Sequence, residues 1–293
     1  MTGTKDMAGT AQEETWTYFE GAWHPGNVRM MGPRTHAAWL ASMVFDGARA
    51  FEGVTPDLDL HLARVNRSAV ALGLEPVVTH ETWTALVREG LARFSPDAAL
   101  YIRPMYWAEG GLGGAVRIDP ASTSWCLCLY EAPMPPPTGF TATLSPFRRP
   151  TADSAPLDAK AGCLYPNGAR AIAEAASRGF GNALMRDALG NVAEFATANV
   201  MMARDGVVYT PVANGTFLAG ITRGRVIALL REAGVTVVET TLTVDDLMGA
   251  DEVFSVGNYA KVVPVTALDD RTFAPGPLFS KARALYWAFA HRQ

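Results

Sequence analysis

The sequence predicts a two-domain α/β (α+β) protein, with a small N-terminal α+β domain and a larger, barrel-like C-terminal α/β domain. At 293 residues the chain is too long for one ordinary small core. Its composition, 49% hydrophobic and 18% charged, is typical of a globular chain with a large interior. The densest proline run is extended and semi-rigid, which predicts a domain boundary. The predicted segments are a flexible tail at 1–14, the small domain at 15–132, the linker at 133–139 and the large domain at 140–293.

The small domain is expected to begin with strands. Aromatic and β-branched residues over 15–28 predict a hairpin that turns at Glu20 and Gly21. A second strand region follows over 43–51. Gly47 interrupts it, and a glycine inside a strand indicates a bulge or a close backbone approach.

Two helices and two further strands complete the small domain. Apolar residues recur at helical spacing over 60–72 and 79–94, which predicts two amphipathic helices. Strands are expected over 99–107 and 125–130. Between them, the glycine cluster at 110–114 lacks the spacing and the following helix of a phosphate loop, so we expect a mobile loop there.

The large domain is expected to alternate strands with helices. Its predicted strands lie at 140–147, 182–187, 192–193, 200–203, 207–210, 235–239 and 252–256. Asn167 is expected to cap a helix over 167–178, and Thr243 a short acidic one. Further helices are expected over 224–233 and 278–290. The Asp-Gly step at 205–206 is a strong hairpin signal.

Charge and composition exclude several classes of function. A net charge of -4 and a pI of 5.8 favour neither nucleic acid nor an anionic membrane as partner. No apolar run approaches the ~20 residues that span a bilayer, and the tail lacks an apolar signal core. The three cysteines, Cys126, Cys128 and Cys163, fit a reducing cytoplasm and are interpreted as small buried hydrophobes. The five scattered histidines predict no metal site.

Lys160 is the first candidate for chemistry. The chain has only four lysines, and three have unremarkable sequence settings: Lys5 is in the tail, Lys261 ends a strand and Lys281 begins the last helix. Lys160 alone lies among small apolar residues, in Ala-Lys-Ala-Gly-Cys. Desolvation there would lower its pKa and free the amine for Schiff-base chemistry. On this stretch alone, a surface lysine with its stem along apolar neighbours is the simpler interpretation.

Three further features complete a candidate site. Tyr165 follows Lys160 by five residues and could return a hydroxyl to the same pocket. Glu194 lies among apolar residues, where a carboxylate needs a partner. Residues 220–222 open a helix, which is a ready phosphate site. Together they describe a pyridoxal phosphate pocket. Singly, Thr222 could be a plain N-cap, Tyr165 a core tyrosine and Glu194 a structural ion-pair partner.

From about Trp16 to Trp287 the sequence resembles the fold-type IV (class IV) aminotransferases, and among them the branched-chain amino acid aminotransferases. Many short motifs carry the resemblance in the same order as in that family. They are Phe45-Asp46-Gly47-Ala48-Arg49, Arg64 with Ser68-Ala69, Tyr101-Ile102-Arg103-Pro104, Ala159-Lys160-Ala161-Gly162 with Tyr165, Glu194 with Asn199, 218–223, and Asp251-Glu252-Val253-Phe254 with Gly257.

The resemblance implies pyridoxal 5'-phosphate as cofactor. Lys160 would hold it as a Schiff base and later move the substrate Cα proton, while Glu194 would keep the ring nitrogen protonated. Tyr165 would bond the 3-hydroxyl, and Leu218 would pack on the ring. The full set of implied cofactor-binding residues is Arg64, Lys160, Tyr165, Glu194, Leu218, Gly220, Ile221, Thr222, Gly257 and Asn258.

The resemblance also implies the substrates: leucine, isoleucine or valine as amino donor and 2-oxoglutarate as acceptor. The implied substrate-binding residues are Leu40, Phe45, Arg49, Tyr101, Arg103, Tyr259 and Ala260. Three positions depart from the family pattern: Leu40 replaces a tyrosine, Asn258 a threonine and Tyr259 a small alanine. Because family members build the pocket across a subunit interface, a homodimer or higher homo-oligomer is implied.

Other functions share this fold and cofactor. D-amino acid transaminases, (R)-selective amine transaminases and aminodeoxychorismate lyase are the alternatives within the family. Arg49 favours the branched-chain interpretation, whereas Leu40 and Tyr259 leave the amine transaminases as an open alternative. A non-catalytic binding protein of the same fold is disfavoured, because Lys160, Glu194 and Arg64 are all present.

Overall fold

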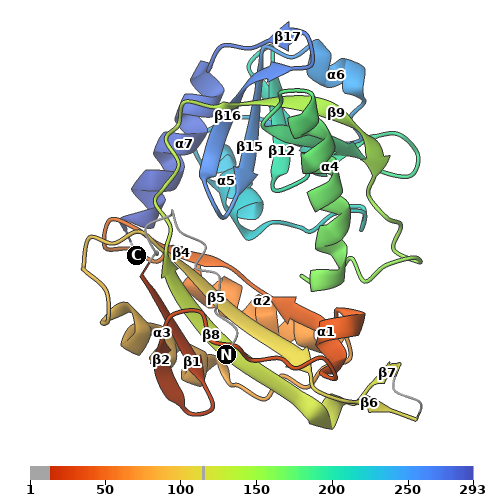
Figure 1. The fold of residues 1–293 in the computed structure, drawn as a ribbon. Helices are drawn as coiled ribbons and strands as arrows, with labels where there is room; N and C mark the ends of the chain where they lie inside the picture. Colours follow the sequence, from red (N-terminus) through yellow and green to blue (C-terminus); the bar gives the residue numbers. More distant parts are fainter. Residues whose placement is uncertain (1–13, 114–115, 293) are drawn as a thin grey trace.

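The computed structural model describes residues 14–113 and 116–292, and it forms two lobes, each built on its own sheet (Figure 1). The first sheet has the strand order β2-β1-β8-β5-β3, with β4 also paired to β5, and all its pairs are antiparallel. Its strands are β1 (Thr15–Phe19), β2 (Ala22–Pro25), β3 (Met43–Phe45), β4 (Ala48–Ala50), β5 (Leu100–Ala108) and β8 (Thr123–Glu131).

Helices cover this first sheet. They are α1 (His36–Leu40), α2 (Leu58–Ala71) and α3 (His80–Leu91), followed by a single 3₁₀ turn, η1 (Pro120–Ser122). The apolar stripes of α2 and α3 form one core with the sheet, because Leu62 and Trp83 pack with Ile102 and Leu129. Gly47 separates β3 from β4, and a Cβ there would lie 1.9 Å from the Tyr101 hydroxyl, so the close approach comes from a side chain and not, as predicted, from a backbone.

The second sheet is mixed and has the order β11-β10-β9-β16-β15-β12-β13-β14, with β17 paired to β16. The sheet curls, so that its edge strand β11 contacts β12. The strands are β9 (Phe140–Arg148), β10 (Asn182–Arg186), β11 (Val192–Phe195), β12 (Asn199–Arg204), β13 (Val207–Pro211), β14 (Val237–Thr240), β15 (Glu252–Gly257), β16 (Lys261–Leu268) and β17 (Arg271–Thr272). The helices are η2 (Gly162–Leu164), α4 (Tyr165–Ser177), α5 (Ile221–Glu232), α6 (Val244–Met248) and α7 (Pro277–Ala290).

Local sequence signals specify most turns and caps correctly. Asp205 and Gly206 both have positive φ, as the tight hairpin between β12 and β13 requires. Thr243 begins α6 with a capping box that is completed by Asp246. The 133–139 run joins β8 of the first sheet to β9 of the second.

Three predictions were wrong. The glycine cluster is not a loop without strands: β6 (Gly111–Leu112) pairs with β7 (Arg117–Ile118), and Gly114 lies outside the described residues. Asn167 does not cap α4, which begins two residues earlier because Pro166 occupies its first turn. Cys163 is exposed rather than buried, since it lies on the short η2 turn.

Lys261 was also misplaced. It begins β16 instead of ending a strand, and it is only 1% exposed. The strand itself was missed because Pro264 interrupts its apolar run, and proline argues against a central strand. The structure accommodates the proline next to a register shift between Val265 and Ala267.

The two lobes meet along the stretch that contains Lys160. Val44 of β3 forms an antiparallel bridge with Ala161, and the buried Asp57 of the first lobe pairs with Arg225 of α5 at 2.5 Å. No helix of the described residues is long and apolar enough to cross a membrane. Among the same residues, no three His, Cys, Asp or Glu side chains gather as a metal site.

Candidate functional site

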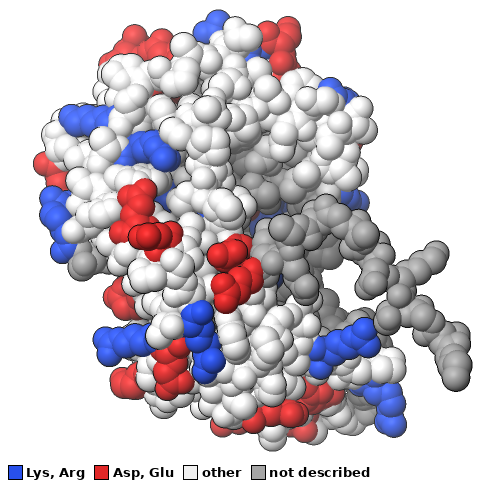
Figure 2. Space-filling model, turned by 60° about the vertical axis from the view of Figure 1, so that its left-hand side comes forward, with Lys and Arg blue, Asp and Glu red and all other residues white. Residues whose placement is uncertain are grey.

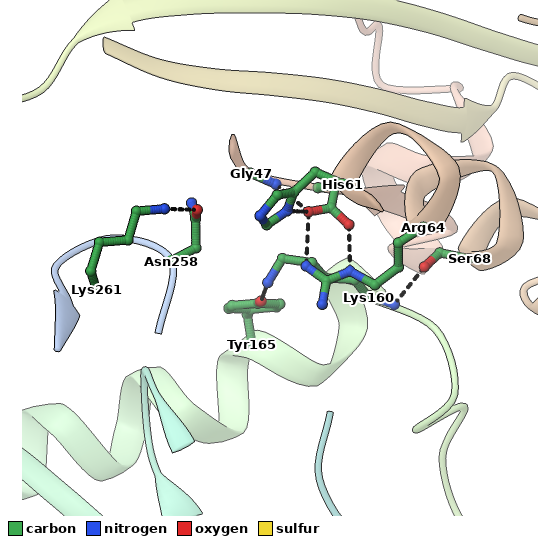
Figure 3. A network of polar contacts seen from close by, with 9 residues as sticks. Gly47, His61, Arg64, Ser68, Lys160, Tyr165, Asn258 and Lys261 are labelled. Carbon is green, nitrogen blue, oxygen red and sulfur yellow. Dashed lines mark hydrogen bonds and ion pairs between the residues drawn. The ribbon is translucent and has the colours of Figure 1, made fainter. Parts of the chain in front are cut away.

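The backbone of Lys160 is fixed by the first lobe. Its N–H donates to Ser68 Oγ of α2 at 3.0 Å, and its carbonyl accepts from the N–H of Phe45 at 3.1 Å. The stretch between β9 and α4 is therefore held on both sides of the lysine, and its side chain extends toward Tyr165 at the start of α4 (Figure 3).

The Lys160 amine lies between two aromatic rings. Nζ donates to Tyr165 Oη at 2.5 Å and is 4.8 Å from the centroid of the Phe45 ring. Burial lowers the pKa of Lys160, with Asp46 opposing this shift. Burial also raises the pKa of Tyr165 to about 12, so the phenol keeps its proton. The pair provides an amine closer to its nucleophilic form beside a neutral hydroxyl.

Glu194 of β11 lies in the same cavity and has the partner that its apolar sequence setting requires. Arg149 Nε is 3.2 Å from Oε1, and Asn199 Nδ2 donates to Oε2 at 3.2 Å. Burial raises the pKa of Glu194 to about 7, although Arg149 and Lys160 lower it. Asn199 also donates to the Leu218 carbonyl at 3.1 Å, which joins the carboxylate to the loop before α5.

This raised pKa gives a test on the cofactor-free protein. A group whose folded pKa exceeds its unfolded value stabilises the fold at low pH, and this stability is lost as pH rises through the folded pKa. Between pH 5 and pH 8 the unfolding free energy of wild type should therefore fall relative to Glu194→Gln, on the order of 3 kcal/mol. Urea denaturation at both pH values measures it. If the difference in unfolding free energy between the two proteins is the same at pH 5 and pH 8, the raised pKa of Glu194 is contradicted.

His61 and Arg64 also line the cavity, and together with Asp46 behind them they form what we call the cup. Asp46, fully buried, accepts from Arg64 Nε at 2.6 Å and from Arg64 Nη2 at 2.8 Å, and it also binds His61 Nδ1 at 2.7 Å. Burial alone would raise the pKa of Asp46, but Arg64 and His61 hold it well below its ordinary value. The charged carboxylate thus fixes both side chains toward the cavity (Figure 3).

The first turn of α5 completes this cup. Its N-cap is Gly220, and within the described residues no side chain caps it, so the helix presents free backbone N–H groups and its positive dipole end. A Cβ at Gly220 would lie 2.2 Å from Asn199 Oδ1, so a larger residue there would displace the Asn199 side chain. Two buried polar atoms beside the same cavity, His61 Nε2 and Asn258 Nδ2, have no hydrogen-bond partner in the described chain.

The cavity unites every residue that the sequence resemblance implied for the cofactor. Its lining includes Arg64, Lys160, Tyr165, Glu194, Leu218, Gly220, Ile221, Thr222, Gly257 and Asn258. These residues come from α2, the stretch before α4, β11, the start of α5 and the turn after β15. Residues that sequence reasoning did not assign to the site also contribute, namely His61, Arg149 and Asn199.

The implied substrate residues form a neighbouring cluster instead. Arg103 stacks on Tyr101, at 5.1 Å from the ring centroid, and lies 6.0 Å from the Phe45 ring. Tyr259, 54% exposed, lies over Arg49 at 5.2 Å. Phe45 connects this cluster to the Lys160 amine. Leu40 and Ala260 are found neither in this cluster nor in the lining of the described cavity.

The missed residues had weak signals. His61 precedes Arg64 by three residues and so shares its face of α2, which a search of the helix could have found. Arg149 directly follows β9, 45 residues before Glu194, and nothing local in the sequence pairs them. The burial of Lys261 depends on the sheet around β16 and had no local signal.

These features define a class of protein. A partly desolvated lysine, a buried carboxylate and an anion cup around one cavity suit an enzyme that acts through a phosphorylated cofactor held on a lysine. The unpartnered Asn258 amide donor beside the cup fits a phosphate group, and the Glu194 carboxylate fits a ring nitrogen.

Comparison with known proteins identifies the family. The family model described as amino-transferase class IV matches residues 43–268, and the chain belongs to this family. The predicted enzyme class and the two-domain α/β fold are thereby confirmed. A branched-chain-amino-acid aminotransferase of Pseudomonas aeruginosa is 32% identical over 268 residues, which cover 86% of this chain and 85% of the relative.

Solved structures agree with this assignment. An aminotransferase from Brucella abortus, solved with bound PLP, is 57% identical with a TM-score of 0.94, over 95% of this chain and 99% of that one. A branched-chain aminotransferase from Thermoproteus uzoniensis, solved with norvaline, is 27% identical with a TM-score of 0.86, over 96% of each chain.

Proposed function

We propose that the protein is a pyridoxal phosphate-dependent aminotransferase that transfers the amino group of branched-chain L-amino acids (leucine, isoleucine, valine) to 2-oxoglutarate, giving branched 2-oxo acids and glutamate. One observation carries the chemical part. The Lys160 amine donates to Tyr165 at 2.5 Å inside a cavity that Glu194 also lines. The names of the relatives support the choice of substrate.

Each of the cavity's polar residues has a proposed role toward the cofactor. When bound, pyridoxal phosphate supplies an electron-withdrawing ring that makes the substrate Cα proton acidic. Glu194 keeps the ring nitrogen protonated, and Arg149 holds this carboxylate in place. Tyr165 donates to the ring hydroxyl oxygen, and Leu218 packs on the ring. Arg64 and the first turn of α5 bind the phosphate.

Lys160 has two successive tasks. It would hold the cofactor covalently, and its amine, when free, would take and return the substrate Cα proton at Nζ. Burial suits both tasks, because a lowered pKa leaves more of the amine neutral at physiological pH. Phe45 on one side and Tyr165 on the other restrict where Nζ can reach.

The arginine and tyrosine cluster beside Phe45 is the proposed substrate pocket. Arg103 Nη2 donates to Tyr130 Oη at 2.5 Å, while its buried Nε has no hydrogen-bond partner in the described residues. A guanidinium with a spare donor suits a substrate carboxylate. Tyr259 is exposed beside it and is proposed to limit the size of the substrate side chain.

The assembly and location follow from the same proposal. We propose a homodimer or higher homo-oligomer that works in the cytoplasm on small molecules. Figure 2 shows acidic and basic side chains mixed over the visible face, with no large region of one sign. Such a surface gives no electrostatic reason for binding nucleic acid or an anionic membrane.

A spectroscopic titration tests the substrate. The cofactor absorbance of the purified protein is followed with L-leucine, D-alanine or (R)-1-phenylethylamine added separately and without acceptor. We expect the visible band to disappear with L-leucine and to persist with the other two. Disappearance only with D-alanine or with the amine would keep the aminotransferase chemistry and overturn the branched-chain substrate.

A further inference from the structure

Lys261 is a second buried lysine, and its setting differs from that of Lys160. It opens β16 directly after the three-residue turn that follows Gly257. Its backbone is left-handed, with φ +63°, a conformation that residues with a side chain seldom adopt. Glycine would suit this backbone better, so the presence of lysine here calls for a role of its side chain.

The surroundings of the Lys261 amine are largely apolar. Its Nζ lies 5.9 Å and 5.5 Å from the ring centroids of Phe51 and Tyr286. The nearby carboxylate, Asp57, is already paired with Arg225. The amine donates one hydrogen bond, to Asn258 Oδ1 at 2.8 Å. Burying an amine among aromatic rings with one amide oxygen as its partner costs free energy. We interpret this cost as evidence that the contact has a function.

This hydrogen bond determines which way the Asn258 amide faces. Because Lys261 Nζ donates to Oδ1, the amide turns its oxygen toward Lys261 and its NH₂ group away. The Nδ2 atom is buried and has no partner in the described chain, although Asn258 lines the cavity together with Arg64 and Thr222. In Figure 3 the pair lies to the left of His61, Arg64 and Lys160.

The group that fills this place must accept hydrogen bonds. Arg64, the first turn of α5 and Asn258 Nδ2 all present donors to one end of the cavity, and that is the pattern of a phosphate site. A threonine at position 258, as in the family pattern, can rotate its own hydroxyl toward a phosphate. For an asparagine, either the amide oxygen or the NH₂ group could face the site, so a neighbouring group must determine which of them does.

We propose that Lys261 is a positioning residue that holds the Asn258 carbonyl oxygen, so that the Asn258 amide donates to the cofactor phosphate. This inference rests on the proposed function. Lysine and asparagine act as a matched pair in this chain. Lys261 itself does not touch the phosphate.

The test compares two ligands that differ only in the phosphate. The full chain, freed of cofactor, is titrated with pyridoxal phosphate and with pyridoxal, and Kd is read from the absorbance. Lys261→Met keeps the length of the side chain and removes its donor. We expect it to weaken pyridoxal phosphate binding by about tenfold or more and to leave pyridoxal binding unchanged. Asn258→Asp should do the same, because a carboxylate would repel the phosphate.

A double substitution separates positioning from packing. In an Asn258→Thr background the hydroxyl needs no lysine, so adding Lys261→Met should change the Kd for pyridoxal phosphate less than twofold. Equal weakening of both ligands, or the same loss in the threonine background, would overturn the inference. If Lys261→Met does not fold, Lys261→Leu replaces it in both backgrounds: a loss confined to pyridoxal phosphate and to the Asn258 background supports the inference, and any other result overturns it.

The control with wild type keeps the two proposals distinguishable. If wild type binds pyridoxal phosphate tightly and the variants bind it equally well, the role of Lys261 is overturned and the proposed function stands. Wild type that shows no visible band with either ligand overturns the proposed function and this inference with it.

Discussion

Replacement of Lys160 by alanine is expected to lower the transamination rate by at least ~10³-fold, because it removes both the covalent link to the cofactor and the group that moves the Cα proton. The Lys160 amine contacts Tyr165 and Phe45 from a fixed backbone, and the cavity lining contains no second lysine. The visible absorbance band should disappear together with the activity.

A matched control is available elsewhere in the chain. Lys281→Ala makes the same chemical change on the exposed side of α7, where the ammonium donates to the Ala233 carbonyl. It should leave rate and absorbance unaltered. A Lys160→Ala protein that keeps more than a tenth of the wild-type rate would refute the assigned role, whatever the behaviour of the control.

Replacement of Arg64 by methionine is expected to cost about 3–5 kcal/mol of unfolding free energy, because it leaves the buried Asp46 carboxylate without its main counter-charge. Arg64 makes two hydrogen bonds to Asp46, which is fully buried and otherwise depends on His61 and the N–H of Gly47. The affinity for pyridoxal phosphate should fall as well. Urea denaturation at pH 7.5 measures the loss of stability.

The sign of the pH dependence follows from Asp46. Its folded pKa lies below its ordinary value, so it stabilises the fold above that ordinary value and loses this contribution as pH falls toward the folded pKa. The wild-type advantage over Arg64→Met should therefore shrink below about pH 4. Adding Asp46→Asn to Arg64→Met should restore part of the stability at pH 7.5.

An exposed arginine on the same helix serves as control. Arg67→Met removes an equal charge one turn away from the buried pair, and its effect should stay within about 0.5 kcal/mol. Equal losses of unfolding free energy in Arg64→Met and Arg67→Met would contradict this account, because they would show that the buried Asp46 carboxylate is not stabilised by Arg64.

Local sequence patterns were sufficient where the determining interactions are local. The Asp205-Gly206 hairpin and the Thr243 cap depend on a few neighbouring residues, and both formed as predicted. The candidate site could also be predicted, since ordered motifs with Lys160 and Glu194 pointed to residues that the structure places in one cavity.

The rest depends on contacts between distant segments. Lys261 looks unremarkable in sequence, and its burial arises only when β16 pairs with β15 on one side and with β9, more than 120 residues earlier, on the other. The Glu194 partner Arg149 likewise becomes a neighbour only through the fold. The glycine cluster was misread because two-residue strands such as β6 have no periodicity to detect.

The central claim is that Lys160, and not another of the four lysines, carries the cofactor. The most direct measurement reduces the cofactor-loaded protein with sodium borohydride, which converts the imine to a stable amine, and identifies the modified peptide by mass spectrometry. We expect one phosphopyridoxyl group per chain, on Lys160. Its presence on Lys261, or its absence from all four lysines, would contradict the account.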